Sequence, residues 1–530
     1  MTGLLAGLDL GTSSAKLVVL DPDGTLVAEA EQAYPTHTAA GGVVEQRPED
    51  WWDATVAVLQ RSGVAARIGA LGLTGQMQDL VPVAARRATR RAILYSDTRA
   101  GSQHQRLRGA VPDWEYRTGN HQDVTNVAAK VAWLAEHEPQ ALTQAQHLLL
   151  GPGAFVAHRA GAEAACDVTT ASTTGLLDVG ERDWLNDAVA AAGALAGQLP
   201  RLTGQVAGDA VVGHVGADAA RETGLAVGTP LVLAMGDAVS TTAGLIGTDP
   251  GEAYLYLGTT GWVAAITPAR DSAPSPIHSL VMPGWEERLR IGAVQSAGSA
   301  AAWALRTFLP GTSFAEAEER VAPRLPAVAD RPLCLPGLAG ERTPVRDGDL
   351  RAAFVGAQET TGPEDLYLAV LTGVAMGLRH AAVEMGATQA RLPLVGGAAG
   401  SAVWRQVLAD VFGATVVVAA AASAPGAVHA AREAAEATGI THALRPVFET
   451  GVQETTPPSP THELLREQLD VHRSLYDALK PTFDDLAEHR RLSTLGGPGR
   501  VIASGPLRCS ETHVPRRGRP AGPSSEVEEA

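Results

Sequence analysis

One short pattern occurs twice in this chain, and it constrains the fold more than any other feature. Near the start, the apolar stretches 7–10 and 17–20 flank a small polar turn, Gly11-Thr12-Ser13. In the second half, residues 253–257 and 261–266 flank the similar turn Gly258-Thr259-Thr260. An apolar strand, a glycine-containing turn and a second apolar strand predict a tight β-hairpin. The repeat predicts that each half of the chain begins with the same device.

The first turn suits phosphate binding. Backbone N–H groups and hydroxyls at Gly11, Thr12 and Ser13 can surround phosphate oxygens. Asp9 precedes the turn, and a carboxylate repels phosphate unless a cation lies between them, so this position predicts Mg²⁺. At the equivalent position the second copy has Tyr256, so only the first half carries the acid. An ordinary hairpin with a turn-stabilising aspartate is the alternative.

Lysine is rare here. The chain has 42 basic residues, but lysine occurs only at Lys16, Lys130 and Lys480. A lysine just after the first turn therefore favours a role at phosphates, although an ordinary surface lysine is the competing interpretation.

Polar residues follow several predicted buried strands directly. The strand at 68–74 leads into Gln76-Met77-Gln78, and the apolar residues 92–94 lead towards Asp97 and Arg99. The strand at 230–235 ends in Gly236-Asp237, followed by a helix of small residues. Open α/β sheets place ligand-binding groups at these strand ends. The alternatives are a solvated loop and a helix-capping role for the aspartate.

A further strand–glycine–helix arrangement lies late in the chain. Residues 392–395 predict a strand, 396–400 a glycine-rich turn that includes Gly397 and Ala398, and 404–411 a helix. This arrangement is typical of nucleotide sites. It matches neither the P-loop pattern nor the Rossmann glycine pattern.

Length predicts more than one domain, since 530 residues are too many for a single core. We expect an N-terminal domain over 1–247 and a C-terminal domain over 248–490, closed by a helix over 463–489. Residues 127–137 also predict a helix, with Trp133 in the core. The Gly-, Pro- and Arg-rich residues 491–530 lack apolar periodicity and predict a disordered tail.

Charge and composition exclude several classes of function. A net charge of −16 argues against nucleic-acid partners and anionic membranes. The three cysteines, Cys166, Cys334 and Cys509, have no metal-binding or paired spacing. We find no leader pattern and no run of about 18 apolar residues, so we expect a cytoplasmic protein without a membrane span. The sequence leaves open whether it forms a homodimer.

Together these motifs resemble the FGGY family of carbohydrate kinases, most closely its xylulokinase-like members. The matching segments, in family order, are Asp9–Lys16, Gly75–Met77, Asp97 with Arg99, Gly236–Asp237, Gly258–Gly261, Gln295–Gly298, Gly340–Pro344 and Gly396–Ala398. The resemblance implies an α/β fold of two actin-like (RNase H-like) ATPase domains with an interdomain cleft that binds ATP, Mg²⁺ and a sugar.

The resemblance also implies residue roles. It makes Asp237 the catalytic base, and it places Asp9 and Asp237 at the metal. The implied sugar-binding residues are Gln76, Met77, Gln78, Asp97, Arg99 and Asp237. The implied phosphate- and nucleotide-binding residues are Gly11, Thr12, Ser13, Lys16, Gly258, Thr259, Thr260, Gly397 and Ala398.

Two departures from the family pattern concern the sugar. Gln78 stands where xylulokinases typically have histidine, and Ala238 stands where they have asparagine. Because Ala238 offers no polar contact, the resemblance predicts a ketopentose-like sugar, D-xylulose or a related pentulose or polyol, without fixing which. The alternatives are a different sugar, such as ribulose, a ketohexose or a sugar acid, an actin- or chaperone-like ATPase without a sugar substrate, and a chain with this fold that has lost activity.

Overall fold

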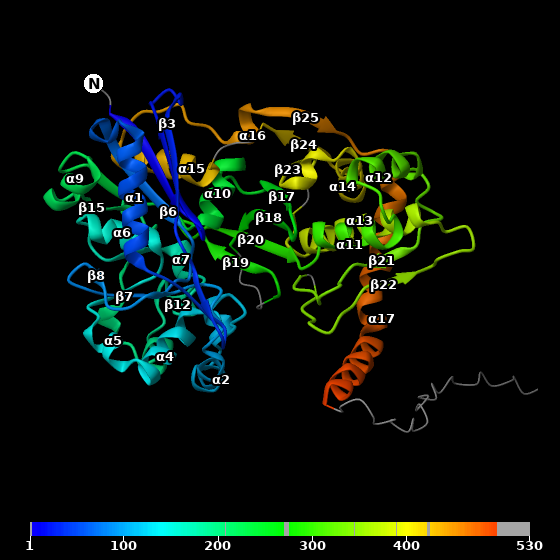
Figure 1. The fold of residues 1–530 in the computed structure, drawn as a ribbon, viewed down its shortest axis with the longest axis horizontal. Helices are drawn as coiled ribbons and strands as arrows, with labels where there is room; N and C mark the ends of the chain where they lie inside the picture. Colours follow the sequence, from blue (N-terminus) through cyan, green and yellow to red (C-terminus); the bar gives the residue numbers. More distant parts are fainter. Residues whose placement is uncertain are drawn as a thin grey trace, which may run out of the picture.

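Two large β-sheets organise the chain, one in each half (Figure 1). The computed structural model describes residues 3–206, 208–269, 275–343, 345–387, 389–420 and 424–495. The first sheet has six strands in the order β15-β16-β6-β1-β2-β3, and the second has seven in the order β19-β20-β18-β17-β23-β24-β25.

The strand bounds are as follows. The first sheet contains β1 (Leu4–Leu10), β2 (Ser14–Leu20), β3 (Leu26–Ala33), β6 (Ile68–Gly75), β15 (Val211–His214) and β16 (Pro230–Leu233). The second contains β17 (Ala253–Leu257), β18 (Gly261–Pro268), β19 (His278–Val281), β20 (Glu287–Val294), β23 (Arg391–Val395), β24 (Thr415–Ala419) and β25 (Val452–Thr456).

The two sheets share one topology. In the first, β1 pairs antiparallel with β2 and parallel with β6, which in turn pairs parallel with β16. In the second, β17 pairs antiparallel with β18 and parallel with β23, which pairs parallel with β24. The repeated hairpin predicted from the sequence is thereby confirmed, and it extends to a repeated sheet.

Alternating side chains of β1 face two different layers. Leu4, Ala6, Leu8 and Leu10 pack in one core with helices α1 (Pro48–Ser62) and α6 (Pro152–Ala160). On the other face, Leu5 packs against Ala427 and Ala431 of helix α15 (Pro425–Thr438). Asp9 shares this second face because successive strand residues point to opposite sides.

Helix α15 connects the two halves in a way that the sequence does not suggest. It lies in the second half of the sequence but packs against β1, β6 and helix α10 (Asp237–Ile246). Helix α10 also packs against the second sheet, where Val239 and Ala243 meet Tyr254 and Ile266. These two helices therefore form the connection between the sheets, and they appear together in the middle of Figure 1.

The second sheet packs against a separate helical layer. Its helices are α11 (Gly298–Phe308), α12 (Phe314–Val321), α13 (Pro363–Glu384), α14 (Ala402–Phe412) and α17 (His462–Leu495). By length and composition α13 could cross a membrane, but 83% of its apolar window is buried inside the structure, as in a core helix. It is the one such helix among the described residues, and the polar residues at both of its ends interrupt the apolar stretch, so it is not an unbroken apolar run.

Smaller elements form a third core between residues 80 and 203, with contributions from Val281 and Trp285. Its helices are α2 (Gly101–Ala110), α3 (Trp114–Thr118), α4 (Val127–His137), α5 (Pro139–Gln144) and α8 (Asn186–Ala191). The remaining helices are α7 (Val168–Ala171), α9 (Ala217–Thr223) and α16 (Val447–Thr450). The short strands are β4 (His37–Ala39), β5 (Val43–Gln46), β7 (Val81–Ala84), β8 (Arg87–Ala88), β9 (Ala92–Ile93), β10 (His147–Leu149), β11 (Ala165–Asp167), β12 (Leu177–Asp178), β13 (Asp183–Trp184), β14 (Arg201–Thr203), β21 (Leu333–Leu335) and β22 (Ala353–Val355).

Several local predictions can be compared with these elements. The helix at 127–137 is confirmed as α4, but Trp133 is only half-buried at the edge of the core, where the Arg99 guanidinium lies over its ring at 4.8 Å. The helix at 463–489 is confirmed and runs past Pro481 to Leu495, so the predicted tail over 491–495 is wrong. The rest of the tail, with Cys509, and Pro344 lie outside the described residues.

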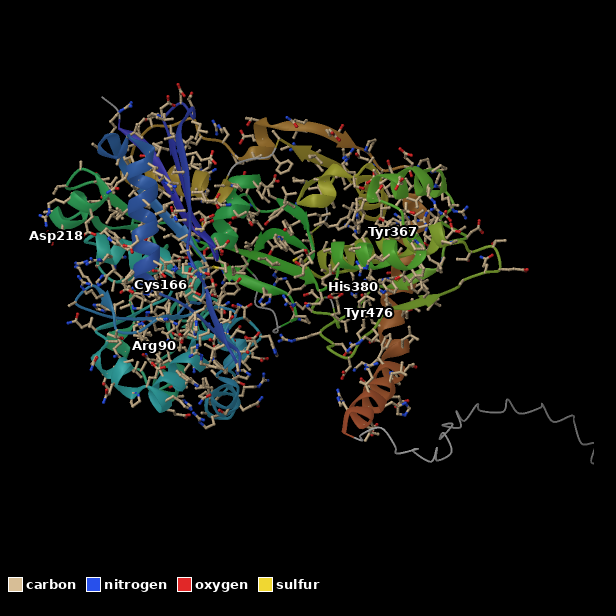
Figure 2. All side chains as sticks on the ribbon, in the orientation of Figure 1. Arg90, Cys166, Asp218, Tyr367, His380 and Tyr476 are labelled. Atoms are coloured by element: carbon tan, nitrogen blue, oxygen red, sulfur yellow. The ribbon has the colours of Figure 1, made fainter. Side chains whose placement is uncertain are left out.

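Buried histidines give the fold a predictable pH dependence. His472 of α17 is fully buried, 3.0 Å from the Cys334 carbonyl oxygen, and burial lowers its pKa to about 4. Figure 2 shows His380 and Tyr476 where α13 meets α17 beside it. Burial likewise lowers the pKa of His380 to about 4.

We expect stability to fall as pH is lowered from about 6.5 towards 4, because unfolded histidine then binds a proton that folded His472 does not. His472→Gln keeps a donor for the Cys334 carbonyl but cannot titrate. The variant should therefore lose about 1.4 kcal/mol less per pH unit over this range than the parent protein. Thermal midpoints measured from pH 7 to 4.5 check this, and parallel curves for both proteins would contradict it.

Candidate active site

Two hairpin turns present exposed hydroxyls. The β1–β2 turn is closed by a hydrogen bond from the Gly11 N–H to the Ser14 carbonyl (3.1 Å), and Thr12 and Ser13 are exposed. In the β17–β18 turn the Gly258 N–H donates to the Thr260 carbonyl (2.9 Å), and Thr259 is exposed. Both turns therefore have the accessible hydroxyls expected of phosphate-binding segments.

Lys16 lies directly across from Asp9 in the β1–β2 ladder. Its side chain is half-exposed, and its Nζ atom is 4.0 Å from Glu31 Oε1. A flexible, partly exposed ammonium group can reach a phosphate, and its role there stays a prediction.

Asp9 and Asp237 come from different elements to one place. Asp9 lies near the end of β1, and Asp237 is the first residue of α10. Gly426 of α15 lies against both elements, since a methyl group added there would be 3.2 Å from Asp9 Oδ2 and from Thr241 Oγ1. The other carboxylate oxygen of Asp9, Oδ1, is enclosed and has no hydrogen-bond partner.

The electrostatics of this pair follow from burial. Burial and then repulsion by Asp9 raise the pKa of Asp237 to about 7. Burial also raises the pKa of Asp9, while Lys16 opposes that rise. A carboxyl with a pKa near neutrality is matched to proton transfer at physiological pH.

The backbone before Asp237 is held by four side chains. Asp167 accepts from the Gly236 N–H (3.1 Å) and Glu433 of α15 accepts from the Met235 N–H (3.3 Å). Thr74 and Ser240 both donate to the Met235 carbonyl at 2.6 Å. Residues from both halves of the sequence therefore hold the backbone segment that leads to Asp237.

The segment after β6 is fixed in a similar way. The buried side chain of Gln76 donates to Gln46 Oε1 (3.0 Å), and Gln46 donates to the Thr12 carbonyl (2.7 Å). Met77 packs against Gly236, where an added methyl group would lie 2.3 Å from its sulfur. Gln78 has a positive φ of 64°, and it is half-buried. The structure therefore brings residues 76–78 next to the Asp237 strand end and links them to the first turn.

Asp97 and Arg99 form a buried ion pair. Asp97 is fully buried and accepts from the Val44 N–H (2.6 Å) and from Arg99 Nη2 (2.6 Å). Arg99 also contacts Glu45 at 2.9 Å. These groups are bonded to one another and to the backbone, so the structure gives them a supporting position, and their predicted contact with sugar stays a prediction.

The second half of the chain holds a cavity of about 750 Å³. Four predicted nucleotide-binding residues line it, namely Gly258, Thr259, Gly397 and Ala398. Residues that the sequence did not indicate, such as Phe314, Tyr367 and Trp404, supply its apolar wall. A mostly apolar cleft of this size with a few polar groups is typical of a small-molecule site. Thr260 is not among the lining residues.

Sequence reasoning missed five residues that support the site. Gln46, Asp167 and Glu433 are described above; Lys130 donates to the Gln78 carbonyl oxygen at 2.8 Å, and Asp79 is the buried residue that follows Gln78. Only Lys130 had a signal, as one of the three lysines in the chain. The others are polar residues in local patterns that equally fit surface positions, so their burial could not be inferred from the sequence.

A duplicated α/β fold, a cleft of small-molecule size and two neighbouring carboxylates are the features expected of a two-domain ATP-dependent phosphotransferase. The chain belongs to the FGGY family of carbohydrate kinases, whose N-terminal domain matches residues 4–244 and whose C-terminal domain matches residues 253–436. It is therefore an ATP-dependent carbohydrate kinase with an alcohol group as acceptor, and its small-molecule partners are a sugar and ATP.

Individual relatives agree with this assignment. The chain is 32% identical to a xylulose kinase of Escherichia coli (strain K12), covering 77% of this chain and 84% of that protein. It is 25% identical to a gluconokinase of Bacillus subtilis (strain 168), covering 79% and 84%. The solved structure of xylulose kinase from Rhodospirillum rubrum aligns with a TM-score of 0.81 at 26% identity, covering 91% of this chain and all of that one. The expected actin-like two-domain fold is thereby confirmed.

Proposed function

We propose that this kinase transfers the γ-phosphoryl group of ATP to a terminal hydroxyl of a ketopentose-like sugar, D-xylulose or a related pentulose or polyol, with Asp237 as the general base. The single observation that carries the proposal is that Asp9, near the end of β1, and Asp237, at the start of α10, lie close enough for Asp9 to raise the pKa of Asp237. Phosphoryl transfer depends mainly on positioning and charge neutralisation. Asp237 can position the acceptor hydroxyl, and the two carboxylates could hold the Mg²⁺ that would neutralise the phosphates.

The geometry of Asp237 supports the role of base. The backbone before it is held by Asp167, Glu433, Thr74 and Ser240, so the start of α10, from which the Asp237 side chain projects, is fixed in place. A pKa of about 7 leaves a substantial ionised fraction at neutral pH and still allows the carboxylate to accept a proton.

The same two carboxylates suit Mg²⁺. Among the described residues, no group of three or more histidine, cysteine, aspartate or glutamate side chains is close enough to form a metal site alone. Magnesium is commonly held by one or two carboxylates together with substrate phosphates, and the enclosed, unpartnered Oδ1 of Asp9 fits this arrangement. When bound, Mg²⁺ would neutralise charge on the phosphates between Asp9, Asp237 and the first turn.

The identity of the sugar rests on residues 76–78 and 238. Gln78 can donate and accept hydrogen bonds with sugar hydroxyls, but it cannot become cationic. The side chain of Ala238 cannot form hydrogen bonds with sugar hydroxyls. The relatives named above include xylulose kinases and a gluconokinase, so a sugar acid is the competing substrate.

The test is an ADP-release screen of the purified protein with ketopentoses, ketohexoses, polyols and sugar acids. We expect a pentulose to stimulate ADP release most strongly. Stimulation by a sugar acid alone would overturn the substrate class and leave the kinase class intact. ATP hydrolysis that no sugar stimulates would favour the actin- or chaperone-like ATPase.

Three further assignments belong to this proposal. We place the domain boundary at 247/248, between the end of α10 and the start of β17. Following the relatives, we assign the protein to the cytoplasm. A homodimer is the oligomeric state to test, by light scattering of the purified protein.

A further inference from the structure

Lys130 is a buried cation directly beneath the predicted sugar-contact segment. It lies on α4, its side chain is fully buried, and its Nζ atom donates to the Gln78 carbonyl oxygen at 2.8 Å. An ammonium group with no solvent exposure must be compensated by charge and hydrogen bonds. Because it is sealed from solvent, Lys130 cannot itself contact a sugar in the cleft.

Asp79 is the compensating charge. It is also fully buried, its Oδ1 accepts from the Tyr95 N–H (2.9 Å), and its Oδ2 has no hydrogen-bond partner. Burial raises the pKa of Asp79 and lowers that of Lys130, and their mutual attraction opposes both shifts. Asp97 and Asp123 add to the attraction on Lys130, while Arg99 opposes it.

The segment between Gln76 and Leu80 is pinned at both ends. The Gln76 N–H donates to the Leu10 carbonyl (3.0 Å), and Leu80 exchanges two backbone hydrogen bonds with Ile93. Between these anchors, Gln78 has a φ of 64°, a left-handed conformation that a residue with a side chain adopts at some cost. Such a conformation persists only where the surroundings hold it, and the hydrogen bond from Lys130 is such a restraint.

The segment 76–80 contacts the residue that precedes the proposed base, Asp237. Met77 packs against Gly236, the residue that precedes Asp237. A change in the conformation of Gln78 would therefore displace Met77, and with it the contact between the sugar-side segment and the Asp237 strand end. A shift of about 1 Å at such a site is enough to reduce turnover or affinity strongly.

We propose that Lys130 is a positioning residue that holds Gln78 in its left-handed conformation and so sets the sugar affinity of the site. This inference rests on the proposed function. It assigns a role to a residue that is outside the cleft and touches neither substrate.

The test compares Lys130→Met, Gln78→Ala and the double variant, with Lys480→Met as the matched control. Lys480 is the exposed lysine of α17, paired with Asp347 and Asp484. We expect Lys130→Met to raise the KM for the sugar about tenfold or more, because it removes a hydrogen bond from a charged donor. The KM for ATP, whose cavity lies in the other half, should stay within about twofold.

The double variant separates positioning from general stability. If Lys130 acts through Gln78, then Gln78→Ala raises the sugar KM in the parent protein and adds less than about twofold in the Lys130→Met background. Equal effects of Gln78→Ala in both backgrounds, parallel rises of the two KM values, or an unchanged sugar KM would each overturn the inference.

A double substitution that removes both buried charges keeps the test usable if Lys130→Met does not fold. If Lys130→Met leaves Asp79 buried and uncompensated and the protein does not fold, Asp79→Asn/Lys130→Met replaces it in the same comparison. Failure of the proposed function is distinguishable, because the parent protein would then show no sugar-stimulated turnover. Failure of this inference alone would leave the sugar-stimulated turnover of the parent protein intact while the variants give one of these three overturning outcomes.

Discussion

Asp237→Asn should lower kcat for sugar phosphorylation by about 10²- to 10⁴-fold, the range expected when a positioned general base is lost. Asparagine preserves the size of the side chain and the start of α10, but it cannot accept the proton of the acceptor hydroxyl. Affinity for ATP should remain nearly unchanged, because the 750 Å³ cavity is lined by residues from the second half of the chain. Steady-state kinetics with the best sugar, together with calorimetric titration of ATP, check both parts.

The matched control for this experiment is Asp218→Asn. Asp218 lies on α9 at the outer edge of the molecule (Figure 2), and its side chain is 85% exposed. This variant removes the same charge far from the site, so its kcat should equal that of the parent protein. A kcat of Asp237→Asn within about threefold of the parent value would rule out Asp237 as the base.

The sequence was sufficient to predict features that depend on neighbouring residues. The two hairpins, the strand that ends at 75 and the glycine-rich turn at 396–400 are local patterns of apolar and small residues, and the structure contains all of them. The strand predicted over 230–235 is also present but ends at Leu233. The pairing of Asp9 with Asp237 came only from the family resemblance, since β6 lies between the strands β1 and β16 that lead to them and no local pattern states this strand order.

Other features depend on partners that no local pattern identifies. Helix α15 was not predicted from the sequence, and its alanine-rich stretch does not indicate which sheet it covers. Asp97 and Arg99 are a strand-end pair in the sequence, yet they satisfy each other inside the protein. The role of Lys130 requires knowing that α4 passes beneath residues 76–79.

Gly72→Ala should destabilise the protein by about 3 kcal/mol or more, the upper range for overpacking a buried contact. Gly7 of β1 and Gly72 of β6 are direct neighbours in the first sheet. A methyl group at Gly72 would lie 1.9 Å from the Ala430 carbonyl oxygen of α15, and one at Gly7 would lie 1.7 Å from that of Ala427. These glycines form the surface on which α15 rests, and their neighbours are backbone atoms that cannot rotate away.

The methyl group of Gly72→Ala should push α15 away from the first sheet, and this displacement of α15 should also reduce kcat. Helix α15 supplies Gly426 beside Asp9 and Glu433 at the Met235 N–H, so moving it disturbs both sides of the carboxylate pair. Gly109→Ala is the matched control, since a methyl group there meets no atom within 4 Å and the position lies inside α2. That control should be neutral or stabilised by about 0.5–1 kcal/mol, as expected for replacing a helical glycine. Denaturant unfolding and kcat should be measured for both variants. Equal unfolding midpoints for Gly72→Ala and Gly109→Ala would contradict the prediction that α15 needs close contact with Gly7 and Gly72.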